Sequence, residues 1–137
     1  MAGRAFADTS GLLALAHRRD QYHGRAAVFA RSFLRSGGRF VSTPLVAAEV
    51  HGLLLYRLGA DPARAALEAL LADSAFDWVP VDTVLIGTAV GGWLQKYRDQ
   101  ALTLCDAVSF EVMRRARLEN AFAFDRHFEV AGFRLIG

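Results

Sequence analysis

The stretch RAFADTS at residues 4–10 decides the fold class, because it joins a short apolar strand to the start of a helix through a single acid. We predict a strand over 4–8, followed by a helix that Ser10 caps and that runs to about His17. A strand that leads directly into a helix begins the alternation typical of an α/β domain with a parallel sheet. Ligands of such sheets bind beyond the carboxyl ends of the strands, where we expect Asp8.

The rest of the chain repeats this alternation of short strands and amphipathic helices. Further strands are predicted at 39–42, 76–81, 121–124 and 133–136, and helices at 23–36, 44–58, 61–72, 83–97 and 103–118. Thr43 caps the helix that begins with Pro44, where the missing N–H of proline costs no hydrogen bond. The pair Gly91-Gly92 is expected to interrupt the helix over 83–97. Right-handed crossovers then give a doubly wound, mostly parallel sheet flanked by helices.

The composition is that of a single folded domain over residues 1–137. Hydrophobic residues make up 53% and charged residues 22%, which excludes a disordered chain. No apolar run approaches the ~18 residues that a membrane helix needs, and the N-terminal apolar stretch is too short and too charged for a secretory signal. The one cysteine, Cys105, cannot form an internal disulfide. We therefore expect a reducing compartment, the cytoplasm.

The charge by itself does not predict a nucleic-acid partner. The formal net charge is +2, from 16 basic and 14 acidic residues, and Lys96 is the only lysine. Arginine suits bidentate contacts with phosphate, but a compositional bias explains the excess of arginine equally well.

The candidate functional residues are the carboxylates of Asp8, Glu49, Asp106 and Asp125. Three of them have simple structural alternatives: Asp8 as a helix cap, Asp106 in a capping box with Thr103, and Asp125 in a turn. Glu49 falls on an apolar face of its helix, where a carboxylate is costly unless it is paired with an arginine or bound to a cation.

Taken together, the four acids predict a metal site. Carboxylates that converge in a low dielectric cannot all stay ionised without a cation, and oxygen ligands favour Mg²⁺ or Mn²⁺. The four histidines show no zinc spacing and are interpreted as isolated surface or helix side chains: His17, His23, His51 and His127. Once a metal neutralises the four acids, ten acidic residues face sixteen basic ones. Basic surroundings and an acidic metal centre are what a phosphodiester-cleaving site needs.

Four segments around these acids carry a family resemblance. FADTS at 6–10, PLVAAEV at 44–50, LTLCDAVSF at 102–110 and AFDRHF at 123–128 resemble, in order, the four motifs of PIN-domain ribonucleases. Within that family the chain is similar to VapC-type toxins of type II toxin–antitoxin pairs. Each motif alone is weakly specific, whereas the ordered set of four covers the whole chain.

The resemblance implies a PIN-like fold and roles for individual residues. The four acids match the acidic metal-binding and catalytic positions of the family. Ser10 and Thr103 match small hydroxyl residues that support the pocket, and Ser109 matches a frequent serine on the third motif's helix. Arg114 and Arg115 match a downstream basic pair, which either faces substrate or is a solvated helix end.

The implied function is that of an endoribonuclease toxin dependent on Mg²⁺ or Mn²⁺, which hydrolyses single-stranded or looped RNA with a metal-activated water. The implied partner is a cognate antitoxin. We also expect a homodimer, because Tyr56, Trp93 and the leucines at 53–55 exceed what one helix face can bury.

Two alternatives remain at this point. A phosphoacceptor or receiver-like module also places an aspartate after its first strand. It would require a further acid or a late lysine, yet the second position after Asp8 is Ser10 and the only lysine is Lys96. A non-catalytic PIN-fold interaction protein is the other alternative. The intact acids argue against it, because a protein without catalysis would gain stability by losing them.

Overall fold

The sheet confirms the predicted α/β class. The computed structural model describes residues 3–137, which contain five strands in the order β3-β2-β1-β4-β5, with every neighbouring pair parallel. The strands are β1 (Arg4–Ala7), β2 (Arg39–Ser42), β3 (Phe76–Trp78), β4 (Asn120–Phe122) and β5 (Arg134–Ile136). The chain starts at the central strand and winds outward on both sides, as in doubly wound sheets. The strands predicted over 76–81 and 121–124 are shorter than expected.

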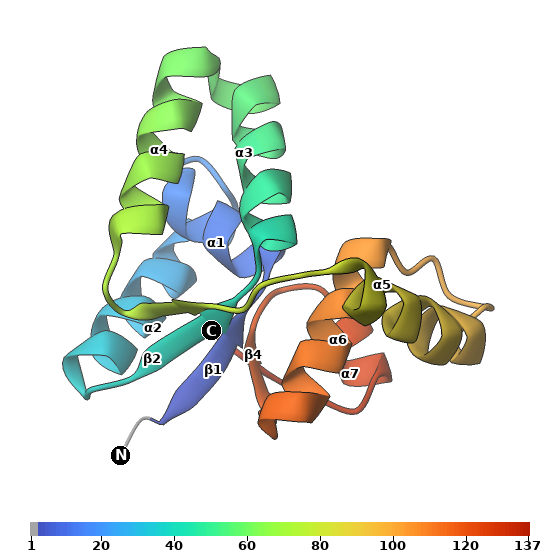
Figure 1. The fold of residues 1–137 in the computed structure, drawn as a ribbon. Coiled ribbons are helices and arrows are strands. Elements are labelled where there is room, and N and C mark those ends of the chain that lie inside the picture. The colour runs from blue at the N-terminus through green and yellow to red at the C-terminus, as the bar shows by residue number, and fades with distance from the viewer. Residues whose placement is uncertain (1–2) are drawn as a thin grey trace.

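The helices connect these strands and cover both faces of the sheet (Figure 1). They are α1 (Thr9–Ala16), α2 (His23–Arg35), α3 (Pro44–Leu58), α4 (Ala60–Ala72), α5 (Thr83–Ala89), α6 (Leu104–Ala116) and α7 (His127–Val130). The short α7 was not predicted. In Figure 1, α3 and α4 stand as a hairpin beyond the carboxyl ends of the strands, and α5, α6 and α7 lie on the opposite side of the sheet from α1 and α2.

The predicted interruption of helix 83–97 is confirmed. After α5 the backbone continues as a π-helix, η1 (Val90–Leu94), which contains Gly91 and Gly92. Glycine disfavours regular helix because its backbone has the most freedom to lose. The wider turn places Trp93 against Phe110 of α6, with ring centroids 5.3 Å apart.

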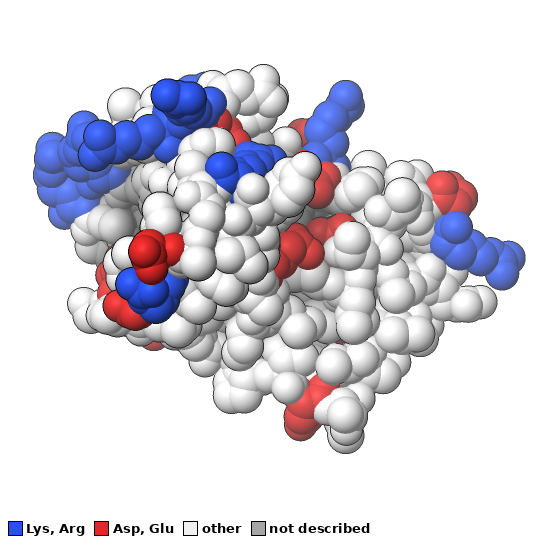
Figure 2. Space-filling view, turned by 90° about the horizontal axis from the view of Figure 1, so that it is seen from above, with Lys and Arg blue, Asp and Glu red and all other residues white. Residues whose placement is uncertain are grey.

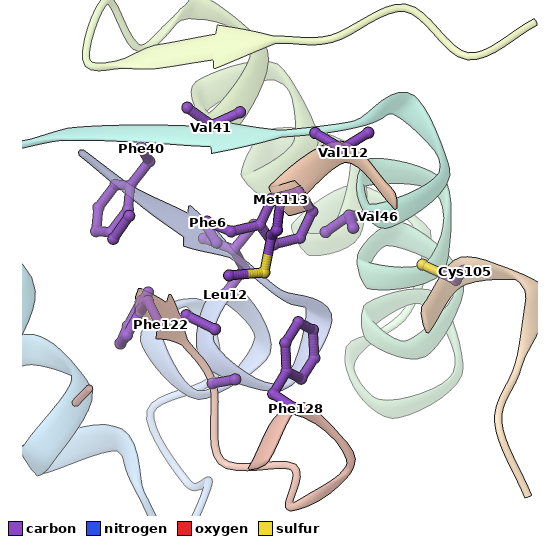
Figure 3. Close-up of a cluster of buried hydrophobic side chains, with 14 of the residues drawn as sticks. Phe6, Leu12, Phe40, Val41, Val46, Cys105, Val112, Met113, Phe122 and Phe128 are labelled. Carbon is purple, nitrogen blue, oxygen red and sulfur yellow. The ribbon is translucent and has the colours of Figure 1, made fainter. Parts of the chain in front are cut away.

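One face of the sheet is packed with aromatic rings. Phe40 of β2 and Phe122 of β4 lie on either side of β1, which offers only small alanines on this face, and their ring centroids are 5.4 Å apart. Phe29 and Phe33 of α2 cover the two rings at centroid distances of 5.1 Å. Figure 3 shows Phe40 and Phe122 within the buried cluster. This packing fixes the position of the carboxyl end of β1 relative to that of β4.

The entry of α1 depends on a glycine. A Cβ atom added at Gly11 would lie 2.3 Å from the backbone oxygen of Phe122, so only glycine lets α1 approach the end of β4 so closely. The Asp8 N–H donates to the same carbonyl oxygen at 3.1 Å. The junction between β1 and α1 is therefore held directly beside the end of β4.

Candidate active site

Asp8 lies at the carboxyl end of β1 and is 2% exposed. Its carboxylate accepts hydrogen bonds from the Ser10 backbone N–H at 3.3 Å and from the Ser10 hydroxyl at 2.9 Å. Asp8 is thus the N-cap of α1, and the prediction that Ser10 caps this helix is wrong. The Ser10 hydroxyl also accepts the Phe124 N–H at 2.9 Å. Ser10 therefore ties the Asp8 carboxylate to the segment that follows β4.

Asp106 lies in the first turn of α6 and is 7% exposed. The Thr103 N–H donates to its carboxylate, and its own N–H donates to the Thr103 hydroxyl, both at 3.1 Å. The capping box considered from the sequence is therefore present. The capping box leaves the carboxylate available for other contacts, because the oxygen that accepts the Thr103 N–H also faces the loop after β4.

Asp125 and His127 meet Asp106 at that loop. The Asp125 carboxylate accepts the His127 backbone N–H at 2.9 Å, which makes the turn that leads into α7. The imidazole Nδ1 of His127 lies 3.3 Å from an Asp125 carboxylate oxygen and 3.7 Å from an Asp106 carboxylate oxygen. One ligand atom from each of the three residues falls within 4.8 Å of the others.

His127 corrects the interpretation of the histidines as isolated side chains. It lies beside Asp106 and Asp125, and the sequence carried a signal for it: His127 follows Asp125 by two residues, within five residues of the end of β4. The spacing of the four histidines does not reveal this role, because the partners of His127 are acids and not other histidines. A mixed site takes one histidine and several acids, and such a set has no short sequence motif of its own.

The buried acids of the site disfavour one another's negative charge. Burial, with a further contribution from Asp106, raises the pKa of Asp8 to about 7. Burial and the neighbouring Asp125 also raise the pKa of Asp106. Within residues 3–137, neither acid forms an ion pair with a lysine or arginine. These carboxylates therefore lack the compensation that buried charges normally require.

Glu49 approaches the site from α3 but is not part of the compact group. Its side chain is half-buried, and no arginine partner is present among the residues that the structure describes. The pKa of the Cys105 thiol shows that Glu49 lies near the start of α6. Burial raises this pKa to about 12, and the negative charges of Glu49, Asp8 and Asp106 contribute to the rise. Figure 3 shows the Cys105 side chain at the start of α6, turned toward α3.

Ser109 and the arginine pair lie outside the acidic group. The fully buried Ser109 hydroxyl donates to the Cys105 carbonyl oxygen at 2.8 Å, so it is used within α6. Arg114 and Arg115 lie about two and a half turns along α6 from Asp106. Both donate to the Glu111 carboxylate, at 2.6 and 2.8 Å. The sequence did not predict this ion pair, and both arginine side chains remain exposed, at 61% and 48%.

Figure 2 looks onto the end of the molecule where the strands terminate. Red carboxylates lie near the middle of this face as well as at its edges, and the largest group of blue basic side chains lies toward one edge. An acidic centre with basic residues at its margin can bind a divalent cation in the middle and a phosphate backbone around it.

The donor set fits a divalent metal. Carboxylate oxygens and one imidazole nitrogen are common ligands of such ions, and the close approach of ionised acids is favourable only with a cation between them. A bound divalent ion activates water and stabilises a leaving oxygen in phosphodiester hydrolysis.

A comparison with protein families gives the class. The PIN domain model matches residues 5–134, so the chain belongs to the PIN domain family. This result confirms the resemblance drawn from the four motifs and excludes the phosphoacceptor alternative.

Individual relatives place the chain among VapC-type ribonucleases. It is 33% identical over 128 residues to the 23S rRNA-specific endonuclease VapC20 of Mycobacterium tuberculosis, a match that covers 93% of this chain and 94% of the relative. The crystal structure of VapC20, described as a sarcin–ricin loop cleaving toxin, matches with a TM-score of 0.83 at 32% identity, over 94% of this chain and 95% of that one. The predicted endoribonuclease function is thereby confirmed.

A more distant structure shares the fold alone. VapBC2 from Rickettsia felis, solved with a DNA fragment from its promoter, matches with a TM-score of 0.67 at 10% identity, over 97% of both chains.

Among the described residues, no helix has the length and apolar character to cross a membrane.

Proposed function

We propose that this chain is a toxin that cleaves 23S ribosomal RNA at the sarcin–ricin loop, using Mg²⁺ or Mn²⁺. The observation that carries the proposal is the group formed by Asp106, Asp125 and His127 beside Asp8, within a chain 33% identical to VapC20. Looped RNA exposes its bases and backbone more than a duplex does, which makes a single phosphodiester bond accessible to the site.

The proposed metal ligands are Asp8, Asp106 and Asp125, with Glu49 acting directly or through water. The metal supplies Lewis-acid activation of the attacking water and charge stabilisation of the leaving oxygen. The chain holds its carboxylates ready for this: Ser10 orients Asp8 and Thr103 orients Asp106 by hydrogen bonds of 2.9 and 3.1 Å. Without the metal, the attacking water would lose its activation and the carboxylates would lose their compensating charge.

The experiment that tests the substrate is sequencing of the 5′ ends of RNA after brief induction of the protein. We expect new ends within the sarcin–ricin loop of 23S rRNA, and none after induction of Asp106→Asn. Ends distributed over many RNAs, or ends that also arise with Asp106→Asn, would contradict the proposed specificity.

We also propose a homodimer and an antitoxin partner in the cytoplasm, where ribosomal RNA is found. Exposed apolar side chains occur on α3 and α4, with Leu55 45%, Tyr56 89% and Leu71 53% exposed. Such a surface is typical of an interface. Trp93, expected to contribute, instead packs against Phe110.

The α3–α4 surface gives the dimer its test. Light scattering at tens of micromolar should give the mass of a dimer for the wild type and of a monomer for Tyr56→Glu, because a buried unpaired charge is costly. A monomeric wild type would exclude the dimer. Co-purification of a second protein with this chain tests the antitoxin partner.

A further inference from the structure

We propose that Nδ1 of His127 binds the divalent metal directly, together with Asp106 and Asp125, and that this nitrogen makes the site prefer transition ions such as Mn²⁺ over Mg²⁺. The inference rests on the proposed function, because it concerns the same site. It adds a nitrogen ligand to a site that would otherwise consist of oxygen ligands alone.

The first observation is the state of the imidazole nitrogen. The Nδ1 atom of His127 is buried, although the side chain is 30% exposed, and it has no hydrogen-bond partner among residues 3–137; carboxylate oxygens of Asp125 and Asp106 lie 3.3 and 3.7 Å away. A buried polar atom without a partner destabilises the folded state. Because this nitrogen points toward two carboxylates, it has the position of a third metal ligand.

The second observation is that the backbone holds the ring in position. The His127 N–H donates to Asp125 at the start of α7. The next residue, Phe128, is fully buried and packs against Phe6 and Phe110, with ring centroids 6.4 and 5.0 Å apart. The imidazole is therefore held beside Asp125 by the same core that supports the sheet.

The third observation is the spacing of the ligand atoms. In an octahedral site with bonds of about 2.1 Å, neighbouring ligand atoms lie about 3 Å apart and opposite ones about 4.2 Å apart. The distances of 3.3 and 3.7 Å lie between these values, and the whole group lies within 4.8 Å. Metal binding thus requires only small movements of the three side chains.

The preference for transition ions follows from ligand chemistry. Mg²⁺ takes oxygen ligands and gains little from a neutral nitrogen, whereas first-row transition ions bind imidazole well. The alternative to a ligand role is that a protonated His127 acts as the cationic partner of the two acids. The two roles predict opposite effects, because removal of a cation would strengthen the binding of every metal, whereas removal of a ligand weakens the binding of transition ions most.

The test is a comparison of Mn²⁺ and Mg²⁺ binding by calorimetry in the wild type, His127→Asn and a control, His51→Asn. We expect His127→Asn to weaken Mn²⁺ binding tenfold or more and Mg²⁺ binding less than threefold, and the control to bind both as the wild type does. Equal changes for the two ions, unchanged binding, or tighter binding would overturn the proposal. His127→Gln provides a second variant if His127→Asn does not fold, as judged by circular dichroism.

A spectroscopic measurement requires no variant at all. Pulsed electron paramagnetic resonance of the Mn²⁺-loaded wild type should show coupling to an imidazole nitrogen, which changes on ¹⁵N labelling of histidine. The absence of this coupling would overturn the proposal even if cleavage is normal. The proposed function fails on a different result, namely cleavage by Asp106→Asn at the wild-type rate.

Discussion

The two halves of α6 bury acids in opposite ways. In its C-terminal half, the Glu111 side chain is 4% exposed and accepts hydrogen bonds from Arg114, Arg115 and the Trp93 indole, at 2.6 to 3.1 Å. The two arginines, Arg114 foremost, lower the pKa of Glu111 to about 2. At the N-terminal end, Asp106 is buried to a similar extent, and its pKa is raised.

The difference separates a structural acid from a functional one. Glu111 is neutralised within the chain and stabilises the contact between α6 and η1. Asp106 receives hydrogen bonds from its cap, but its acidic neighbours leave its charge uncompensated. A buried carboxylate whose pKa is raised by burial and by other acids is typical of a site that binds a cation.

The largest expected effect distinguishes the two acids by activity. Asp106→Asn should reduce RNA cleavage by a thousandfold or more, about 4 kcal/mol in the barrier, because the metal site loses a charged ligand. Glu111→Gln, assayed below its melting temperature, should cleave within threefold of the wild type. The measurement is the initial rate on a sarcin–ricin loop oligonucleotide in Mg²⁺ and in EDTA, and a comparable loss in both variants would remove the distinction.

The second effect is stabilisation by metal. Mn²⁺ at a hundred times its Kd should stabilise the wild type by roughly 2.7 kcal/mol, because it binds the folded state. Asp106→Asn should respond much less, and in EDTA it should be at least as stable as the wild type, since the amide retains a hydrogen-bond acceptor and removes repulsion. Thermal melts in EDTA and in Mn²⁺ provide the test. A clear loss of stability in EDTA with an unchanged metal response would assign Asp106 to the capping box alone.

The third effect is the pH dependence that Asp8 imposes on the metal-free protein. Its folded pKa of about 7 lies above the ordinary 3.8, so the folded state binds more protons than the unfolded state between these values. The free energy of unfolding should therefore fall as pH rises, by up to about 1.4 kcal/mol per pH unit, or about 2 kcal/mol from pH 5 to 6.5. Urea titrations in EDTA should show a shallower dependence in Asp8→Asn, and equal slopes would contradict the assignment.

The smallest effect concerns Glu111, the acid of α6 that is paired with two arginines. Glu111→Gln should lower the free energy of unfolding at pH 7 by about 1–2 kcal/mol, because exposed arginines are partly screened by solvent. The folded pKa of Glu111 is depressed, so its contribution is present above pH 4.5 and is lost as pH falls toward 2. The difference between wild type and variant in urea should accordingly shrink on acidification, whereas a constant difference would point to packing.

Much of the fold could be predicted from local sequence. The strand–acid–helix junction at Asp8, the Thr43-Pro44 start of α3 and the glycine pair in η1 were readable because caps, proline and glycine act within a few residues. The missed α7 is four residues long, shorter than a periodic pattern can indicate. The misplaced cap at Ser10 reflects two candidates, Asp8 and Ser10, only two residues apart, between which the backbone conformation decides.

The sequence by itself determined the order of the motifs, the class of the sheet and the acids placed at its carboxyl edge, because each depends on short-range chemistry. The tertiary structure decided which side chains meet. It brought His127 to Asp106 through the register of β4 and the packing of Phe128, and it paired the exposed side chains of Arg114 and Arg115 with the buried Glu111. Such contacts depend on the relative position of elements distant in the chain, and that position is set by the aromatic core, which no local pattern encodes.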